Sequence, residues 1–132
     1  MVLVDTSVWI AFFREGSSLA ARKLDMLLEE GEACICGLIE AELLPGLQRK
    51  DRARLRTLMA GLPCLETATD IWTAVADIQE RSLAQGLGPF SIPDLIVAAV
   101  ALRHKVPLFS LDKHLLSIAR VTGLQLWEAS AS

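Results

Sequence analysis

Short apolar runs alternate with longer segments of helical spacing along this sequence, and that alternation limits the fold more than any other feature. The first run occupies residues 1–4, carries no charged side chain and stops at Asp5. A strand that is apolar on both faces is typical of a parallel sheet covered by helices on both sides. By the same criterion, later strands are expected at residues 33–36, 64–66, 106–110 and 124–126.

The segments between these runs combine helix caps with apolar residues at helical spacing. They predict helices at residues 8–13, 19–30, 38–47, 51–62, 94–104 and 113–120, and one that begins at 67 or 69 and ends near 85. Short strands that alternate with helices indicate an α/β fold. We therefore expect residues 1–132 to form a single three-layer α/β/α domain with a central parallel sheet of about five strands.

Four acidic residues are expected near one edge of this sheet. Asp5 follows the first strand, Asp112 follows the fourth, and Asp94 lies in the first turn of an apolar helix. Glu42 lies on the helix after the second strand, from which it can reach the same edge. Functional residues of parallel α/β sheets collect beyond the carboxyl ends of the strands. An acid that enters an apolar run is costly to bury unless it is paired or bound to metal, so the placement indicates a functional cluster.

Carboxylates without clustered histidine or cysteine suit hard cations, and we expect Mg²⁺ (or Mn²⁺) at this edge. Such a cation can polarise a phosphoryl oxygen and activate water, which makes a phosphodiester the natural substrate. Neither histidine is expected to be a catalytic base, because His104 lies at a helix end and His114 is interpreted as an exposed helix residue.

Two other interpretations remain open from the residues alone. Each acid by itself also fits a helix cap, a first-turn acid or a solvated helix residue, which would suit a non-catalytic interaction module. An aspartate-nucleophile phosphohydrolase would use Asp5 to attack phosphate. Such enzymes usually carry a second acid two residues later, where this chain has Ser7.

The net charge of −3 argues mildly against a nucleic-acid binder, but the basic residues are unevenly distributed. Five of the 13 lysines and arginines lie close together, at Arg49, Lys50, Arg52, Arg54 and Arg56. This basic stretch is either a solvated helix face or a patch that contacts a phosphate backbone without reading its sequence. An aromatic content of 5%, with no tyrosine, disfavours a base-stacking platform.

Hydrophobic residues make up 52% of the chain and the mean hydropathy is +0.41, so part of the apolar surface is expected to meet a partner. Three cysteines and a start without the basic region of a signal peptide indicate free thiols and a cytoplasmic location. The longest apolar run, residues 95–102, is too short to span a membrane.

Four segments of the sequence together resemble PIN-domain ribonucleases. They are LVDTSVWI at residues 3–10, AELLPG at 41–46, PDLIVAA at 93–99 and LFSLD at 108–112. Within that family, the chain is most similar to the VapC-type toxins of bacterial and archaeal toxin–antitoxin pairs. The resemblance implies a three-layer α/β/α fold and Mg²⁺- or Mn²⁺-dependent endonuclease activity on RNA. It also implies a cognate antitoxin protein as partner and a toxin homodimer.

The resemblance carries the family's acidic quartet over to Asp5, Glu42, Asp94 and Asp112. It assigns metal binding to the three aspartates, and it gives Glu42 either a metal contact or the positioning of the attacking water. Thr6 and Ser110 match hydroxyl residues that are expected to orient carboxylates or water. Hydrolysis by metal-activated water would leave 5′-phosphate and 3′-hydroxyl ends.

The sequence departs from the family pattern at one position and is ambiguous at another. Many relatives carry a further acid where this chain has His114. Glu40 lies two residues from Glu42, and two such residues point apart on a helix, so only one of them is expected to face the metal. The residues around Glu42 favour that glutamate, with Glu40 as the alternative.

Overall fold

The structure is a computed structural model of the chain, and it describes residues 1–127. Within this range, four strands form one sheet in which every pairing is parallel. The strand order is β3-β2-β1-β4. The strands are β1 (Val2–Val4), β2 (Ala33–Cys36), β3 (Cys64–Leu65) and β4 (Leu108–Phe109). The expected domain also takes in residues 128–132, which lie outside the described part of the chain.

The fifth expected strand is reduced to a single bridge. Leu126 pairs in parallel with Leu108, and the backbone N–H groups of Leu108 and Trp127 complete this pairing at 2.9 and 2.8 Å. The segment thus occupies the fifth position beside β4. Within residues 1–127, its pairing is this one bridge, beside a β4 of two residues.

All seven expected helices are present, with shifted ends. The segment expected as one helix over residues 38–47 divides into a helix and a 3₁₀ turn, η1 (Leu44–Gly46), because Pro45 has no N–H to continue the helical ladder. The helix expected from residue 67 or 69 begins at Ile71. The helices are α1 (Thr6–Arg14), α2 (Leu19–Glu29), α3 (Gly37–Leu43), α4 (Arg49–Ala60), α5 (Ile71–Ala84), α6 (Ile92–His104) and α7 (Lys113–Thr122).

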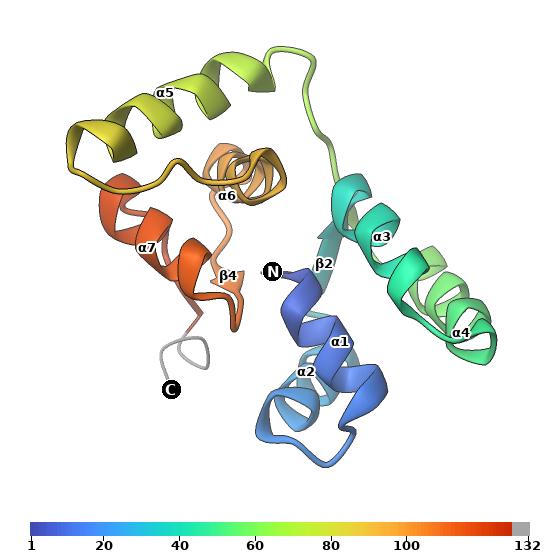
Figure 1. Ribbon diagram of the computed structural model, residues 1–132. Coiled ribbons are helices and arrows are strands. Elements are labelled where there is room, and N and C mark those ends of the chain that lie inside the picture. The colour runs from blue at the N-terminus through green and yellow to red at the C-terminus, as the bar shows by residue number, and fades with distance from the viewer. Residues whose placement is uncertain (128–132) are drawn as a thin grey trace.

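The helices cover both faces of the sheet. Right-handed crossovers place the helices between β1 and β3 on one face, and those that follow β3 on the other, because the chain reverses direction along the sheet after β3. Figure 1 shows α5, α6 and α7 packed together on one side and α1 against α2 on the other. The three-layer α/β/α prediction is confirmed. Strands β1 and β4, which continue into helices on opposite faces, therefore flank the switch point where such folds bind ligands.

The core is built around β1 and α6. Leu3 and Val4 are fully buried, and every residue of α6 from Leu95 to Ala101 is buried. A helix that is apolar on all sides requires such an environment. Asp94 stands in the first turn of this helix, so the core itself fixes its place. No helix in residues 1–127 is both long and apolar enough to cross a bilayer.

The loop that leads into α6 is held by one side chain. Gln79 of α5 donates from Nε2 to the Phe90 carbonyl oxygen at 2.8 Å and accepts from the Phe90 N–H at 2.9 Å. Gly88 has a φ of 77°, and a Cβ there would lie 2.9 Å from the Phe90 nitrogen, so only glycine fits. Ser91 then caps α6 by accepting from the Asp94 N–H at 3.3 Å.

This double contact leads to a stability prediction. Gln79→Ala removes both hydrogen bonds to Phe90 and is expected to lower the free energy of unfolding by about 2 kcal/mol, at about 1 kcal/mol for each bond. Gln85→Ala is the matched control, because its side chain is exposed, and it should change stability by less than about 0.5 kcal/mol. Urea unfolding measures both. Equal values for the two variants would contradict the role given to Gln79.

Candidate metal centre

Asp5 lies at the carboxyl end of β1, where it also caps α1. Its side chain is buried, with 5% of the residue exposed, and Oδ2 accepts hydrogen bonds from the hydroxyls of Ser7 and Ser110, each at 2.8 Å. Its backbone N–H donates to the Phe109 carbonyl oxygen at 2.9 Å, which joins the ends of β1 and β4. The carboxylate is therefore fixed at the switch point of the sheet.

The two serine hydroxyls also hold the loop that carries the next acid. Ser110 Oγ accepts from the Asp112 N–H, and Ser7 Oγ accepts from the Leu111 N–H, both at 3.0 Å. Ser110 was expected to orient an acid, and it lies in hydrogen-bond contact with Asp5. In the sequence, Ser7 was considered only as the position where an aspartate-nucleophile phosphohydrolase would carry its second acid. Its contact with a loop more than 100 residues away has no signal in the sequence.

Asp94, Asp112 and His114 form a compact group of potential metal ligands. One donor atom from each lies within 4.8 Å of the other two. Nδ1 of His114 is 3.7 Å from Oδ1 of Asp112 and 4.0 Å from Oδ2 of Asp94. Asp112 caps α7 by accepting from the His114 N–H at 2.7 Å. The interpretation of His114 as an ordinary exposed helix residue thus overlooked two acidic neighbours.

The two glutamates of α3 face different surroundings. Oε1 of Glu42 accepts from the Thr6 hydroxyl at 3.4 Å, which places it beside the residue that follows Asp5. Glu40 instead forms an ion pair with Arg56 of α4 at 3.1 Å. The structure therefore directs Glu42, and not Glu40, toward the end of β1.

The carboxylates share one electrostatic field. Burial is the main cause that raises the pKa values of Asp5, Glu42 and Asp94 above their ordinary range. The charge of Asp5 adds to the rise at Glu42 and at Asp94, and the charge of Asp112 adds to it at Asp94. Asp5 and Glu42 lie outside the compact group, yet their charges act within the same site. Carboxylates that raise one another's pKa values are relieved by a cation between them.

The donor set matches a divalent cation. It consists of carboxylate oxygens, which Mg²⁺ and Mn²⁺ prefer, and one imidazole nitrogen. The acids also cap or begin helices, since Asp5 caps α1 and Asp112 caps α7. Capping and metal binding are compatible, because a carboxylate oxygen that accepts one hydrogen bond keeps a second lone pair for a cation.

The basic stretch is only partly available for binding. Arg52 donates to the Leu47 carbonyl oxygen at 2.8 Å, and the Arg54 guanidinium lies over the Phe12 ring, 5.0 Å from its centroid. Arg56 is paired with Glu40. The exposed side chains of Arg49 and Lys50 begin α4.

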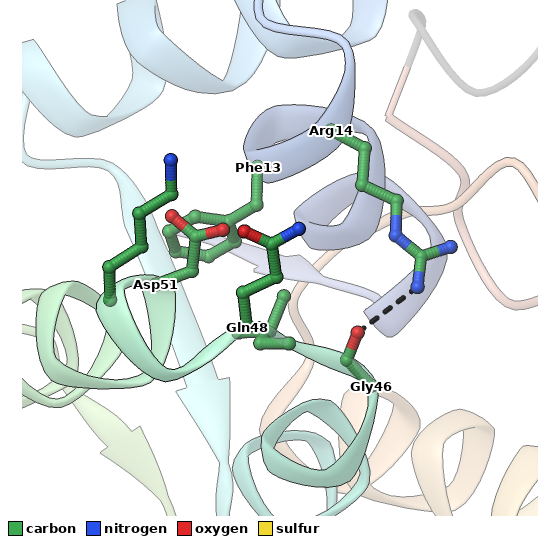
Figure 2. Close-up of a pocket in the computed structure, with 7 residues that line it drawn as sticks. Phe13, Arg14, Gly46, Gln48 and Asp51 are labelled. Atoms are coloured by element: carbon green, nitrogen blue, oxygen red, sulfur yellow. Dashed lines mark hydrogen bonds between the residues drawn. The ribbon is translucent and has the colours of Figure 1, made fainter.

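Lys50 lines a cavity of about 360 Å³ between the end of α1 and the start of α4. Figure 2 shows Arg14 closing one side of it by donating to the Gly46 carbonyl oxygen at 3.0 Å. None of the four acids lines this cavity.

Comparisons with known proteins agree with the fold. A profile of the PIN domain family matches residues 2–121. Ribonuclease VapC11 of Mycobacterium tuberculosis is 37% identical over 95% of this chain and 96% of its own length. Ribonuclease VapC21 of the same organism is 31% identical over 85% of this chain and 83% of its own.

Two solved structures share the fold at lower sequence identity. One is VapBC2 from Rickettsia felis bound to a DNA fragment from its promoter, with a TM-score of 0.76, 16% identity and coverage of 96% of this chain and 98% of that chain. The other is a toxin–antitoxin complex from Klebsiella pneumoniae, with a TM-score of 0.65, 20% identity and coverage of 86% and 88%.

The raised pKa of Asp5 gives a pH-dependent prediction for the metal-free protein. Because its pKa is higher in the folded than in the unfolded chain, the linked stability is present below about pH 4 and is lost as the pH rises through the raised value. Asp5→Asn removes this loss and keeps an oxygen for the two serine hydroxyls. It is expected to increase the free energy of unfolding at neutral pH, with a gain that vanishes near pH 4.

Urea unfolding in EDTA across this pH range measures the effect. Asp25→Asn, which changes an exposed acid of α2, is the control and should show no such gain. If Asp5→Asn does not gain stability at neutral pH, burial is not the cause of the raised pKa of Asp5.

Proposed function

This chain belongs to the PIN-domain family, and we propose that it is a metal-dependent endoribonuclease that acts as the toxin of a toxin–antitoxin pair. Two relatives, at 37% and 31% identity, are named as ribonucleases and cover most of the chain. The observation that carries the proposal is the placement of the family's aspartates where β1 and β4 end, with donor atoms of Asp94 and Asp112 within 4.8 Å of each other. A phosphodiester is the substrate that such a site suits.

We assign metal binding to Asp5, Asp94 and Asp112. When bound there, Mg²⁺ or Mn²⁺ supplies a charge that polarises the phosphoryl oxygen and lowers the pKa of water. Asp5 is held for this role by the two serine hydroxyls, and Asp94 by the buried helix on which it stands.

Glu42 is proposed to position the attacking water and to accept its proton. The residue as a whole is exposed, but the partial burial of its carboxylate raises its pKa and makes it a better proton acceptor than an ordinary glutamate. The hydroxyl of Thr6 orients it from the first turn of α1. Expected products carry a 5′-phosphate and a 3′-hydroxyl, because a water nucleophile does not require the ribose 2′-hydroxyl.

The RNA contact is proposed to involve the basic stretch. Arg49 and Lys50 are the best placed of its members, because their side chains are exposed and, within residues 1–127, no ion pair engages them. Contacts from these residues would fall on phosphates and would add affinity without sequence specificity. The part played by Arg52, Arg54 and Arg56 stays a prediction.

We also propose an antitoxin protein as partner and a homodimer as the assembly. The Klebsiella pneumoniae structure with this fold is a toxin–antitoxin complex. Trp72 and Leu83 of α5 are 59% and 51% exposed, and a separation of eleven residues puts them on the same helix face. This apolar face is available for a second protein chain.

The other interpretations are less well supported. An aspartate-nucleophile phosphohydrolase would need an acid where Ser7 stands, and the Ser7 hydroxyl instead bonds to Asp5. A purely structural role for the acids accounts for the capping contacts of Asp5 and Asp112. It does not account for their position so near Asp94 and Glu42 that the negative charges help to raise the pKa values of these two acids.

The two glutamates of α3 offer a matched test of the catalytic assignment. Glu42→Gln is expected to lower the rate of RNA cleavage by at least ~100-fold, since it removes the proton acceptor. Glu40→Gln breaks only a partly exposed ion pair with Arg56 and should stay within about threefold of the unaltered protein. Initial rates on total RNA with Mg²⁺ or Mn²⁺ measure both. A larger loss in Glu40→Gln than in Glu42→Gln would reverse the assignment.

Product chemistry tests the mechanism separately. We expect EDTA to abolish cleavage and added Mn²⁺ or Mg²⁺ to restore it. The new ends should accept ligation as a 5′-phosphate and a 3′-hydroxyl. Ends blocked by a 2′,3′-cyclic phosphate would show that the ribose hydroxyl, and not water, is the nucleophile.

A further inference from the structure

We propose that His114 is a direct metal ligand, and that its imidazole gives this site a preference for Mn²⁺ over Mg²⁺. The inference rests on the proposed metal-dependent nuclease and adds a residue to its metal centre. It concerns a position at which this chain has a nitrogen donor among carboxylates.

The first support is distance. Nδ1 of His114 lies 3.7 Å from Oδ1 of Asp112 and 4.0 Å from Oδ2 of Asp94. Ligand atoms about 2.1 Å from one octahedral ion are about 3.0 Å apart when adjacent and about 4.2 Å apart when opposite. Both separations fall within this range, and the donor atoms of the third pair, Asp94 and Asp112, lie within 4.8 Å of each other. Small adjustments would therefore let one ion contact all three side chains.

The second support is the way the ring is held. Asp112 caps α7 and accepts from the backbone N–H of His114, so the two residues are fixed together at the start of the helix. The Phe90 ring packs against the imidazole with 6.1 Å between centroids. Phe90 is itself fixed by the two hydrogen bonds that its backbone forms with the Gln79 side chain. The imidazole thus has one aromatic neighbour and two acidic neighbours.

The third support is space for an ion and its water ligands. A cavity of about 340 Å³ opens between the loop before α6 and the start of α7, and its wall includes Phe90, Ser91, Asp94 and His114. The His114 side chain is 57% exposed, so its movement toward an ion would not disturb the core. Solvent can also complete the coordination shell.

The imidazole nitrogen of His114 determines which of the two metal ions the site prefers. Mg²⁺ takes oxygen ligands and gives up its waters reluctantly, whereas Mn²⁺, the first transition ion of the divalent series, binds a nitrogen donor more readily than Mg²⁺ does. Mn²⁺ accepts carboxylate oxygens equally well, so a mixed site of acids and one imidazole suits it better than Mg²⁺. If His114 only formed ion pairs with the two acids, its nitrogen would coordinate neither metal and would give no preference between them.

Pulsed electron paramagnetic resonance tests the contact directly. The full chain without a histidine tag is freed of metal and loaded with Mn²⁺, and nitrogen coupling to the ion is recorded. The chain has two histidines, so two variants assign the signal. We expect coupling in the unaltered protein and in His104→Gln, whose ring meets the Glu66 carbonyl oxygen, and we expect it to vanish in His114→Gln.

Metal affinity gives a second readout that does not depend on activity. In His114→Gln, the affinity for Mn²⁺ should fall on the order of 10-fold, because the loss of a residue that merely hydrogen-bonds to a metal ligand already lowers metal affinity by about that factor. The affinity for Mg²⁺ should change much less. His114→Asp should bind Mg²⁺ well and lose the preference for Mn²⁺. Circular dichroism verifies that each variant is folded.

The outcomes separate this inference from the proposed function. Mn²⁺ bound without nitrogen coupling, or coupling that persists in His114→Gln, overturns the role of His114 and leaves the nuclease in place. Failure of the unaltered protein to bind Mn²⁺ or Mg²⁺ overturns the metal-dependent nuclease itself.

Discussion

The hydrogen bonds that Asp5 accepts from Ser7 and Ser110 are the contacts on which the arrangement of the site depends. A carboxylate buried at the end of β1 would be costly without them. Through the same two hydroxyls, the end of β1 and the loop after β4 become one unit. The distance between Asp5 and Asp112 is thus set by short polar contacts and not by the packing of distant helices.

Much of the fold could be predicted, because burial on both faces leaves a clear mark in the sequence. The run before Asp5 and the strand at Ala33–Cys36 were located closely, since each is a charge-free segment between helical ones. The fifth strand could not be judged in the same way. Its pairing depends on the length of its neighbour, β4, and no local pattern reports that length. The early end of α3 was signalled by Pro45, although the 3₁₀ turn that follows was not.

The site could be predicted only as a set of acids at one edge. Strand ends gave positions for Asp5 and Asp112, but no distance between them. Helical spacing predicted that only one of Glu40 and Glu42 faces the site, and the residues around Glu42 favoured that one. The contact of Ser7 with Leu111 and the approach of His114 to Asp94 join residues far apart in the chain. Such contacts follow from the strand order β3-β2-β1-β4, which brings β1 beside β4 and which the sequence did not specify.

The burial of α6 on every side from Leu95 to Ala101 has a consequence for control of the enzyme. A helix enclosed by close-packed neighbours cannot shift or rotate without opening the core, which is stiff on that scale. Asp94 is therefore carried by a part of the molecule that a bound inhibitor cannot displace cheaply. An inhibitor that acts on Asp94 would therefore have to cover its carboxylate or compete for its ion, since moving it would mean opening the core.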